Sequence, residues 1–128
     1  NLETDLNFNK ASGVFMNYTL QFIRPLHREN LIRNIYKKIK SKGCLILMEK
    51  VLENNSMINR MYIDLYYEYK KTMGYSKVEI SRKREALENV LIPYRTDENI
   101  KLLKESGFKS IDTFFKWFNF VGIIAIKL

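Results

Sequence analysis

Two short apolar segments with a helix-like segment between them place the strongest constraint on the fold. Gly13 to Asn17 and Cys44 to Met48 have the composition of buried strands. Between them, Arg28 to Ile39 carries apolar residues three and four positions apart, and Pro25 suits the first turn of that helix. Strands joined through a helix at these spacings pair in parallel. The sequence therefore predicts a βαβ unit within an α/β fold.

Polar side chains follow the first predicted strand. Its apolar run stops at Asn17, and Tyr18 and Gln21 come next, before the helix begins. Open α/β sheets bind their ligands in a crevice outside the carboxyl ends of the strands. Asn17 is therefore a candidate pocket residue, and Tyr18 and Gln21 are further candidates.

Two consecutive helices are predicted after the second strand. Ser56 to Thr72 interleaves aromatic and charged residues, and Ser76 with Glu79 has the spacing of a capping box for a helix that runs toward Pro93. Helices inserted after a sheet strand suggest a cap over the strand ends. We expect residues 56–92 to form this helical cap.

The remaining residues complete a single domain over residues 1–128. A short helix is expected at Asn99 to Glu105, followed by β-rich runs at Lys109 to Lys116 and Phe118 to Lys127 that suit an antiparallel pair at the sheet edge. A content of 46% apolar residues supports a packed core in a chain of 128 residues.

The formal net charge of +8 favours anionic partners but does not choose among them. The basic residues occur in short clusters such as Lys37-Lys38, Lys70-Lys71 and Arg82-Lys83-Arg84, without a run of five or six. A dedicated nucleic-acid tail is therefore not expected, and solvated helix faces account for most of this charge.

Several site classes are disfavoured by the residue inventory. Cys44 is the single cysteine, expected to be a small buried thiol, and His27 is the single histidine, expected at the surface near a helix start. Glu49, Glu53 and Asp64 have no spacing that specifies acid–base work or a metal cluster. The chain shows no apolar stretch of the roughly 20 residues that span a bilayer, nor a basic-then-apolar leader. The expected compartment is the cytoplasm, without membrane contact and without a metal.

Arg84 stands out on the helix that follows Ser76. At about 100° per residue, Arg84 falls within about 40° of Ile80, and Lys83 lies about 60° away on the other side. A guanidinium on a core-facing stripe needs an anionic partner, and its planar fork matches a carboxylate. That partner is either a structural one, such as Glu49, Glu53 or Glu88, or a bound ligand.

Successive blocks along the chain resemble the carboxy-S-adenosylmethionine synthases, a branch of the class I methyltransferase fold. The blocks occur in family order with closely similar spacing: Asn17 to Phe22, Gly43 with Glu49-Lys50, Gly74 to Ser76 with Glu79 to Ser81, Lys83-Arg84 with Leu87-Glu88, and Trp117 to Phe120. The resemblance implies the C-terminal half of a Rossmann-like sheet with two inserted cap helices and a terminal antiparallel strand pair. It also implies that Asn17 lines the cofactor pocket and that Arg84 holds the carboxylate of carboxy-S-adenosylmethionine.

The implied reaction converts S-adenosylmethionine and prephenate into carboxy-S-adenosylmethionine and phenylpyruvate. The substrate supplies the base, so no catalytic side chain is required. The product would serve wobble-uridine modification of tRNA by a second enzyme, so direct tRNA binding by this chain is not expected. Relatives commonly form homodimers, and the two inserted helices are the expected interface.

The resemblance covers only the later part of such a domain. A glycine-rich cofactor loop and an acidic residue for the ribose are not found in the chain. We therefore expect this half alone to lack full cofactor affinity and to be inactive. Two other functions stay open at this point. They are an ordinary methyltransferase of a small molecule or RNA, and a noncatalytic interaction module that uses the aromatic helix face around Tyr62, Tyr66 and Tyr69.

Overall fold

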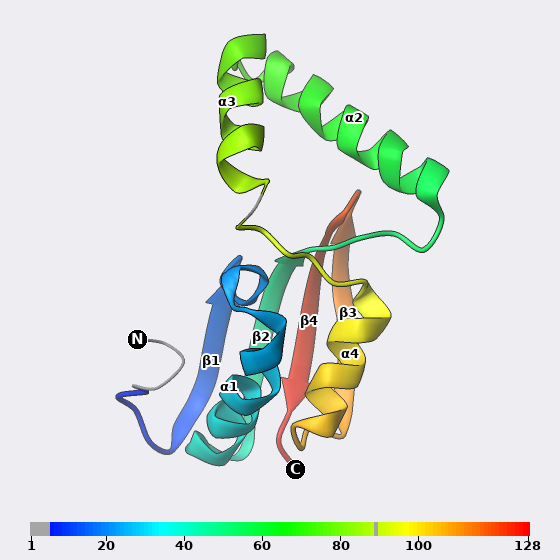
Figure 1. Cartoon of the computed structure of the whole chain (residues 1–128). Coiled ribbons are helices and arrows are strands. Elements are labelled where there is room, and N and C mark those ends of the chain that lie inside the picture. Colours follow the sequence, from blue (N-terminus) through cyan, green and yellow to red (C-terminus); the bar gives the residue numbers. More distant parts are fainter. Residues whose placement is uncertain (1–5, 89) are drawn as a thin grey trace.

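A four-stranded sheet forms the centre of the computed structural model, which describes residues 6–88 and 90–128. The strands are β1 (Ala11–Asn17), β2 (Ile39–Lys50), β3 (Ser110–Trp117) and β4 (Phe120–Ile126), in the spatial order β1-β2-β4-β3. β1 and β2 are parallel, and β4 is antiparallel to both β2 and β3 (Figure 1). The predicted βαβ unit and the terminal antiparallel pair are both confirmed.

Helix α1 (Pro25–Lys38) connects the two parallel strands, with Pro25 in its first turn. Strand β2 begins at Ile39, directly after the helix. The pairing with β1 shifts from Ala11↔Ile39 to Gly13↔Cys44, so extra residues of β2 form an irregularity there. Gly43 is required at this place, because a Cβ would lie 2.8 Å from the Ser12 carbonyl oxygen and 2.9 Å from that of Lys40.

One face of the sheet carries the core. α1 and α4 (Thr96–Glu105) lie side by side across this face (Figure 1). Leu31, Ile32 and Ile35 of α1 and Leu103 of α4 are nearly inaccessible to solvent, as are Leu45, Leu47 and Ile123 of the sheet. Burial of each such side chain contributes about 1.5 to 3 kcal/mol.

The first strand is less buried than its apolar sequence indicates. Among the described residues β1 pairs only with β2, and Met16 is its one buried side chain, while Phe15 is 66% exposed. Cys44 is likewise half-buried rather than buried. The expectation of a strand and a thiol covered on both faces is therefore wrong for the part of the chain that is described, because α1 and α4 cover one face only.

Two helices stand beyond the carboxyl ends of β1 and β2. α2 (Ser56–Thr72) and α3 (Lys77–Leu87) meet at an angle and project from the sheet (Figure 1). The capping box of Ser76 and Glu79 is present. α3 ends at Leu87, so Leu91 lies in the segment that returns to the sheet. None of the described helices is long and apolar enough to cross a membrane.

Candidate functional site

A buried carboxylate joins the ends of the two parallel strands. Glu49, near the end of β2, accepts hydrogen bonds from the backbone N–H groups of Leu20 (3.1 Å) and Gln21 (3.2 Å) in the short helix η1 (Leu20–Phe22). The side-chain oxygen of Gln21 in turn accepts a bond from the backbone N–H of Lys50 at 2.9 Å. Glu49 is only 2% exposed, and burial raises its pKa to about 7 despite the two N–H donors and nearby Arg28.

A second buried network ties the base of the cap to the loop after β1. Arg28 of α1 donates from Nε to the carbonyl of Ile23 and from one terminal nitrogen to the carbonyls of Gln21 (3.2 Å) and Ile92 (2.7 Å). The backbone N–H of Ile92 also donates to the Gln21 carbonyl at 3.0 Å. The guanidinium of Arg28 lies over the Tyr94 ring, 4.3 Å from its centroid. The segment that leaves the cap is thereby held against η1.

Aromatic side chains connect α2 to the turn between β3 and β4. Tyr66 packs edge-on against Phe120 with ring centroids 4.9 Å apart, and Tyr69 packs against Trp117 at 5.0 Å. Tyr18, just after β1, also packs edge-on against Phe120, with ring centroids 6.0 Å apart. The aromatic face of α2 is therefore largely an intramolecular contact, which supports the cap above the strand ends.

A cavity of about 640 Å³ lies between the two cap helices and the end of β2. Its aromatic and apolar lining comes from Tyr66 and Tyr67 of α2 and from Ile80, Leu87 and Leu91. Its charged lining comes from the cations Lys50, Lys70, Lys83 and Arg84 and the anions Glu85 and Glu88. Cations outnumber anions in this lining, so the cavity suits an anionic ligand with an apolar body.

Three of these cations lie near the rings of two consecutive tyrosines, Tyr66 and Tyr67. Lys50 lies 5.3 Å from the Tyr66 ring centroid, and Lys70 lies 5.6 Å from it. The guanidinium of Arg84 lies 5.5 Å from the centroid of Tyr67. Burial lowers the pKa of Lys50, and the positive charges of Lys70 and Arg84 lower it further. A bound anion would relieve this like-charge repulsion.

Helical spacing predicted that Arg84 lies on the same face of α3 as Ile80 and Leu87. The structure agrees, because all three residues line the same cavity. The surroundings differ from the expected core, however, because Arg84 is exposed and only Ile80 of α3 is buried. Among the described residues no ion pair joins Arg84 to a carboxylate. Arg84 therefore forms no salt bridge with Glu49, Glu53 or Glu88, the structural partners that the sequence offered.

The other predicted site residues, Asn17, Tyr18 and Gln21, are not part of the lining of this cavity. Asn17 is exposed at the end of β1, and its backbone carbonyl accepts a bond from the Thr19 hydroxyl. Tyr18 has a positive φ of 52° and donates its backbone N–H to the Met48 carbonyl. Burial raises the pKa of Tyr18, and Glu49 raises it further. Gln21 is 7% exposed and engaged with Lys50, which gives it a role in positioning the loop.

Three important residues were not assigned a role from sequence. Lys50 comes just after the second predicted strand. Because open α/β sheets bind ligands outside the carboxyl ends of their strands, this position could have indicated a ligand-binding side chain. Glu49 and Arg28 gave no signal of their buried hydrogen bonds, because their partners are backbone groups distant in sequence.

His27 is exposed at the start of α1, as expected. No group of three potential metal-ligating side chains occurs among the described residues.

Two curated relatives of this chain share one name. The carboxy-S-adenosyl-L-methionine synthase of Nautilia profundicola is 54% identical over 126 residues, which are 98% of this chain and 53% of that protein. The protein of the same name from Methylococcus capsulatus is 50% identical over 130 residues, covering 98% of this chain and 54% of its own length. The chain thus spans about half the length of the curated relatives it matches. The resemblance seen in the sequence is confirmed.

Similarity to a solved structure supports the fold. Human N-acetylserotonin methyltransferase, solved in complex with SAM, matches with a TM-score of 0.63 and 15% identity, over 99% of this chain and 32% of that chain. The match confirms an α/β fold of the methyltransferase type, of which this chain forms a part. None of the family models searched matches the chain.

Proposed function

We propose that this chain, which is homologous to about half of the carboxy-S-adenosyl-L-methionine synthases, is the C-terminal half of such an enzyme. The observation that carries the proposal is Arg84, which lines a cavity next to the aromatic face of α2 with no carboxylate partner among the described residues. A guanidinium in this setting binds a carboxylate through two parallel hydrogen bonds. The feature that distinguishes carboxy-S-adenosylmethionine from S-adenosylmethionine is such a carboxylate.

The residues present fit the acidic end of this ligand. Arg84 is proposed to hold the carboxylate, with Lys50 and Lys70 adding positive potential from β2 and α2. Asn17 is proposed to contact the ligand from the end of β1, with Tyr18 beside it, and Gln21 to support that loop through Lys50. The rest of the cofactor would require the half of the protein that is not part of this chain, so this half alone is proposed to be inactive.

The proposed reaction takes S-adenosylmethionine and prephenate to carboxy-S-adenosylmethionine and phenylpyruvate. S-adenosylmethionine supplies the sulfonium methyl group that becomes carboxylated. As prephenate becomes aromatic, it releases its ring carboxyl group as carbon dioxide and its ring hydroxyl group as hydroxide. The hydroxide takes the methyl proton and leaves as water, and the methyl carbon then forms its new bond to the carbon dioxide. The chain's own contribution is binding and electrostatics: a dianionic substrate is attracted to a cavity with four cations and two anions in its lining. The product is proposed to serve wobble-uridine modification of tRNA by another enzyme, in the cytoplasm, without tRNA contact at this cavity.

A homodimer through the cap is part of the proposal. α2 has no buried residue, and Met57, Met61 and Leu65 are 75%, 48% and 41% exposed. Exposed apolar side chains on one helix face are stabilised by contact with another apolar surface. A second copy of the chain presents the same surface, so the two copies can pair symmetrically. Sedimentation of the full-length protein tests this: we expect a dimer, and a monomer after substitution of Met61 and Leu65 by aspartate.

The test of function is product formation by the full-length protein. We expect a mixture of S-adenosylmethionine and prephenate to yield carboxy-S-adenosylmethionine and phenylpyruvate in equal amounts, measured by mass spectrometry. Omission of prephenate should abolish both products. Methyl transfer to another acceptor, with no dependence on prephenate, would instead identify an ordinary methyltransferase, which shares this fold.

A further inference from the structure

Four chain segments come together at the amino ends of β1 and β2, the end of the sheet opposite the cap (Figure 1). We call this surface the basal face; it consists of residues 7–10, 36–43, 109–111 and 126–128. Lys42 donates its backbone N–H to the Lys127 carbonyl at 2.6 Å, and the Lys38 ammonium donates to the Phe8 carbonyl at 3.2 Å. Ser110 pairs with Ile126 between β3 and β4. These bonds place the four segments side by side.

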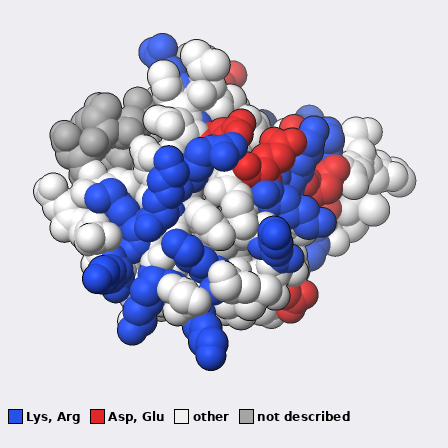
Figure 2. All heavy atoms as spheres, turned by 90° about the horizontal axis from the view of Figure 1, so that it is seen from below, with Lys and Arg blue, Asp and Glu red and all other residues white. Residues whose placement is uncertain are grey.

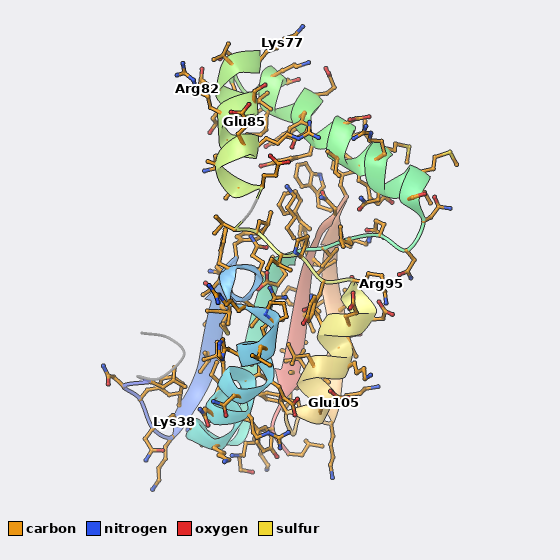
Figure 3. All side chains as sticks on the ribbon, viewed as in Figure 1. Lys38, Lys77, Arg82, Glu85, Arg95 and Glu105 are labelled. Atoms are coloured by element: carbon orange, nitrogen blue, oxygen red, sulfur yellow. The ribbon has the colours of Figure 1, made fainter. Side chains whose placement is uncertain are left out.

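The basal face is strongly positive. Its segments contain no aspartate or glutamate and seven lysines, namely Lys10, Lys37, Lys38, Lys40, Lys42, Lys109 and Lys127. Figure 2 looks at this end of the molecule and shows basic side chains spread over it, with the acidic ones mainly toward one side. Figure 3 labels Lys38 at the same end.

The lysines of this face are not neutralised by the acids of the described structure. None of the ion pairs found among the described residues includes a lysine of the basal face. Lys38 and Lys127 donate to backbone carbonyls, which leaves their charge uncompensated. Lys10, Lys37, Lys40, Lys42 and Lys109 are exposed. Concentrated positive charge of this kind attracts a polyanion.

The side chains of the basal face also indicate which polyanion fits. Among the described residues of its four segments, Leu128 is the only large apolar side chain that is strongly exposed. The centre of a protein interface is typically depleted in charged residues and enriched in aromatic ones. Membrane-surface helices insert an apolar face, and sites for single-stranded nucleic acid use aromatic rings for base stacking. Contact with the phosphates of a double helix needs only cations and hydrogen-bond donors.

We propose that the basal face binds the phosphate backbone of double-helical nucleic acid, RNA or DNA. The contact is independent of base sequence, since lysines act as point charges toward phosphate oxygens. It also lies at the opposite end of the sheet from the cavity, so it does not depend on the proposed reaction. The sequence expectation of no nucleic-acid tail rested on the lack of a continuous basic run, and that of no direct tRNA contact rested on the use of the product by a second enzyme. The fold assembles a basic surface from lysines that are separate in sequence.

The test uses the full-length protein and fluorescence anisotropy with a labelled 20-base-pair RNA duplex and a DNA duplex of the same sequence. One variant replaces Lys37, Lys40, Lys42 and Lys109 by glutamine. The control variant removes the same charge from the cap through Arg60, Lys71, Lys77 and Arg82, all exposed. Figure 3 shows Lys77 and Arg82 on α3, at the far end of the molecule. Circular dichroism and ligand binding at the cavity confirm that both variants are folded.

We expect the basal variant to bind the duplex at least tenfold more weakly at 100 mM salt. The negative slope of log affinity against log salt should decrease in magnitude by about 3.6, which is about 0.9 for each of the four lysines. The control variant should keep the parent slope. Equal affinity for RNA and DNA would indicate phosphate contact alone, and tighter RNA binding would add contact with the 2′-hydroxyl. Equal losses in both variants, no duplex binding at 50 mM salt, or binding to phosphatidylserine vesicles in place of duplex would overturn the proposal.

Discussion

Glu49 and Gln21 hold the ends of β1 and β2 together through hydrogen bonds that run in opposite directions. The Glu49 carboxylate accepts from the backbone N–H of Gln21, and the Gln21 side-chain oxygen accepts from the backbone N–H of Lys50, the residue after Glu49. The same pairing fixes Lys50 at the cavity and Tyr18 beside Phe120. An interior carboxylate therefore positions the strand ends next to the cavity without being part of the cavity lining.

Replacement of Glu49 by glutamine should remove a pH dependence of stability. The folded-state pKa is raised to about 7 from 4.5, so folding favours the protonated form. This contribution is fully present below about pH 4.5 and is lost as the pH rises through about 7, with a total change of about 3 kcal/mol. Urea unfolding of the full-length protein at several pH values measures it. We expect the parent to lose stability over this window relative to Glu49→Gln; parallel curves would show that Glu49 does not titrate there.

Arg28→Ala should destabilise the protein by about 3 kcal/mol. The substitution leaves the carbonyls of Ile23 and Ile92 without their guanidinium donors and removes a side chain that is only 1% exposed. The exposed Arg24 provides the matched control, because Arg24→Ala should change the free energy of unfolding by less than about 0.5 kcal/mol. Similar small effects in both variants would mean that the Arg28 network contributes little.

Lys50→Gln should weaken binding of carboxy-S-adenosylmethionine by about tenfold and flatten its alkaline pH dependence. Burial and the charges of Lys70 and Arg84 lower the pKa of Lys50, so its positive charge is lost at a pH below its usual 10.5. Affinity of the parent should therefore fall as the pH is raised toward 10, since a charged hydrogen bond contributes about 1.5 to 3 kcal/mol. Isothermal titration calorimetry between pH 7.5 and 10 measures the effect. Lys71→Gln is the control and should follow the parent, because Lys71 is exposed and is not part of the cavity lining.

Gly43→Ala should destabilise the fold more than Gly13→Ala, although both glycines lie where β1 and β2 pair. A Cβ at Gly43 would stand 2.8 Å from the backbone oxygen of Ser12, which cannot move without breaking the strand pairing. A Cβ at Gly13 meets its nearest atom at 3.7 Å, an ordinary contact. We expect a difference of about 2 kcal/mol in thermal or urea unfolding. Equal stabilities would show that the strand irregularity at Gly43 can relax.

Patterns that are local in sequence predicted the elements well. The capping box of Ser76 and Glu79 lies within a single turn, and the helix from Ser56 to Thr72 follows the prediction to the residue. The start of β2 could not be predicted from local patterns, because the backbone at Lys42, with a φ of 67°, is stabilised by the distant Lys127 carbonyl. The exposure of Phe15 was also missed, since an apolar strand has the same sequence whether or not a partner covers it.

The candidate site was predictable only in part. Helical spacing alone put Arg84 on the same face as Ile80 and Leu87, and these three residues do line one cavity. The cavity residues from β2 and α2, such as Lys50 and Lys70, could not be predicted. Their position depends on how the cap packs over the strand ends through Tyr66 and Phe120, which no spacing in the sequence specifies. For the same reason the basal face could not be seen in the sequence, where Lys42 and Lys127 are far apart.

Arg84, as the residue proposed to hold a ligand carboxylate, is the centre of the proposed function. Native mass spectrometry of the full-length protein as purified, beside Arg84→Ala and the neighbouring control Arg82→Ala, tests it most directly. We predict carboxy-S-adenosylmethionine in the parent and in the control, and its loss or replacement by S-adenosylmethionine in Arg84→Ala. S-adenosylmethionine in all three proteins would contradict the account and would assign this chain to an ordinary methyltransferase.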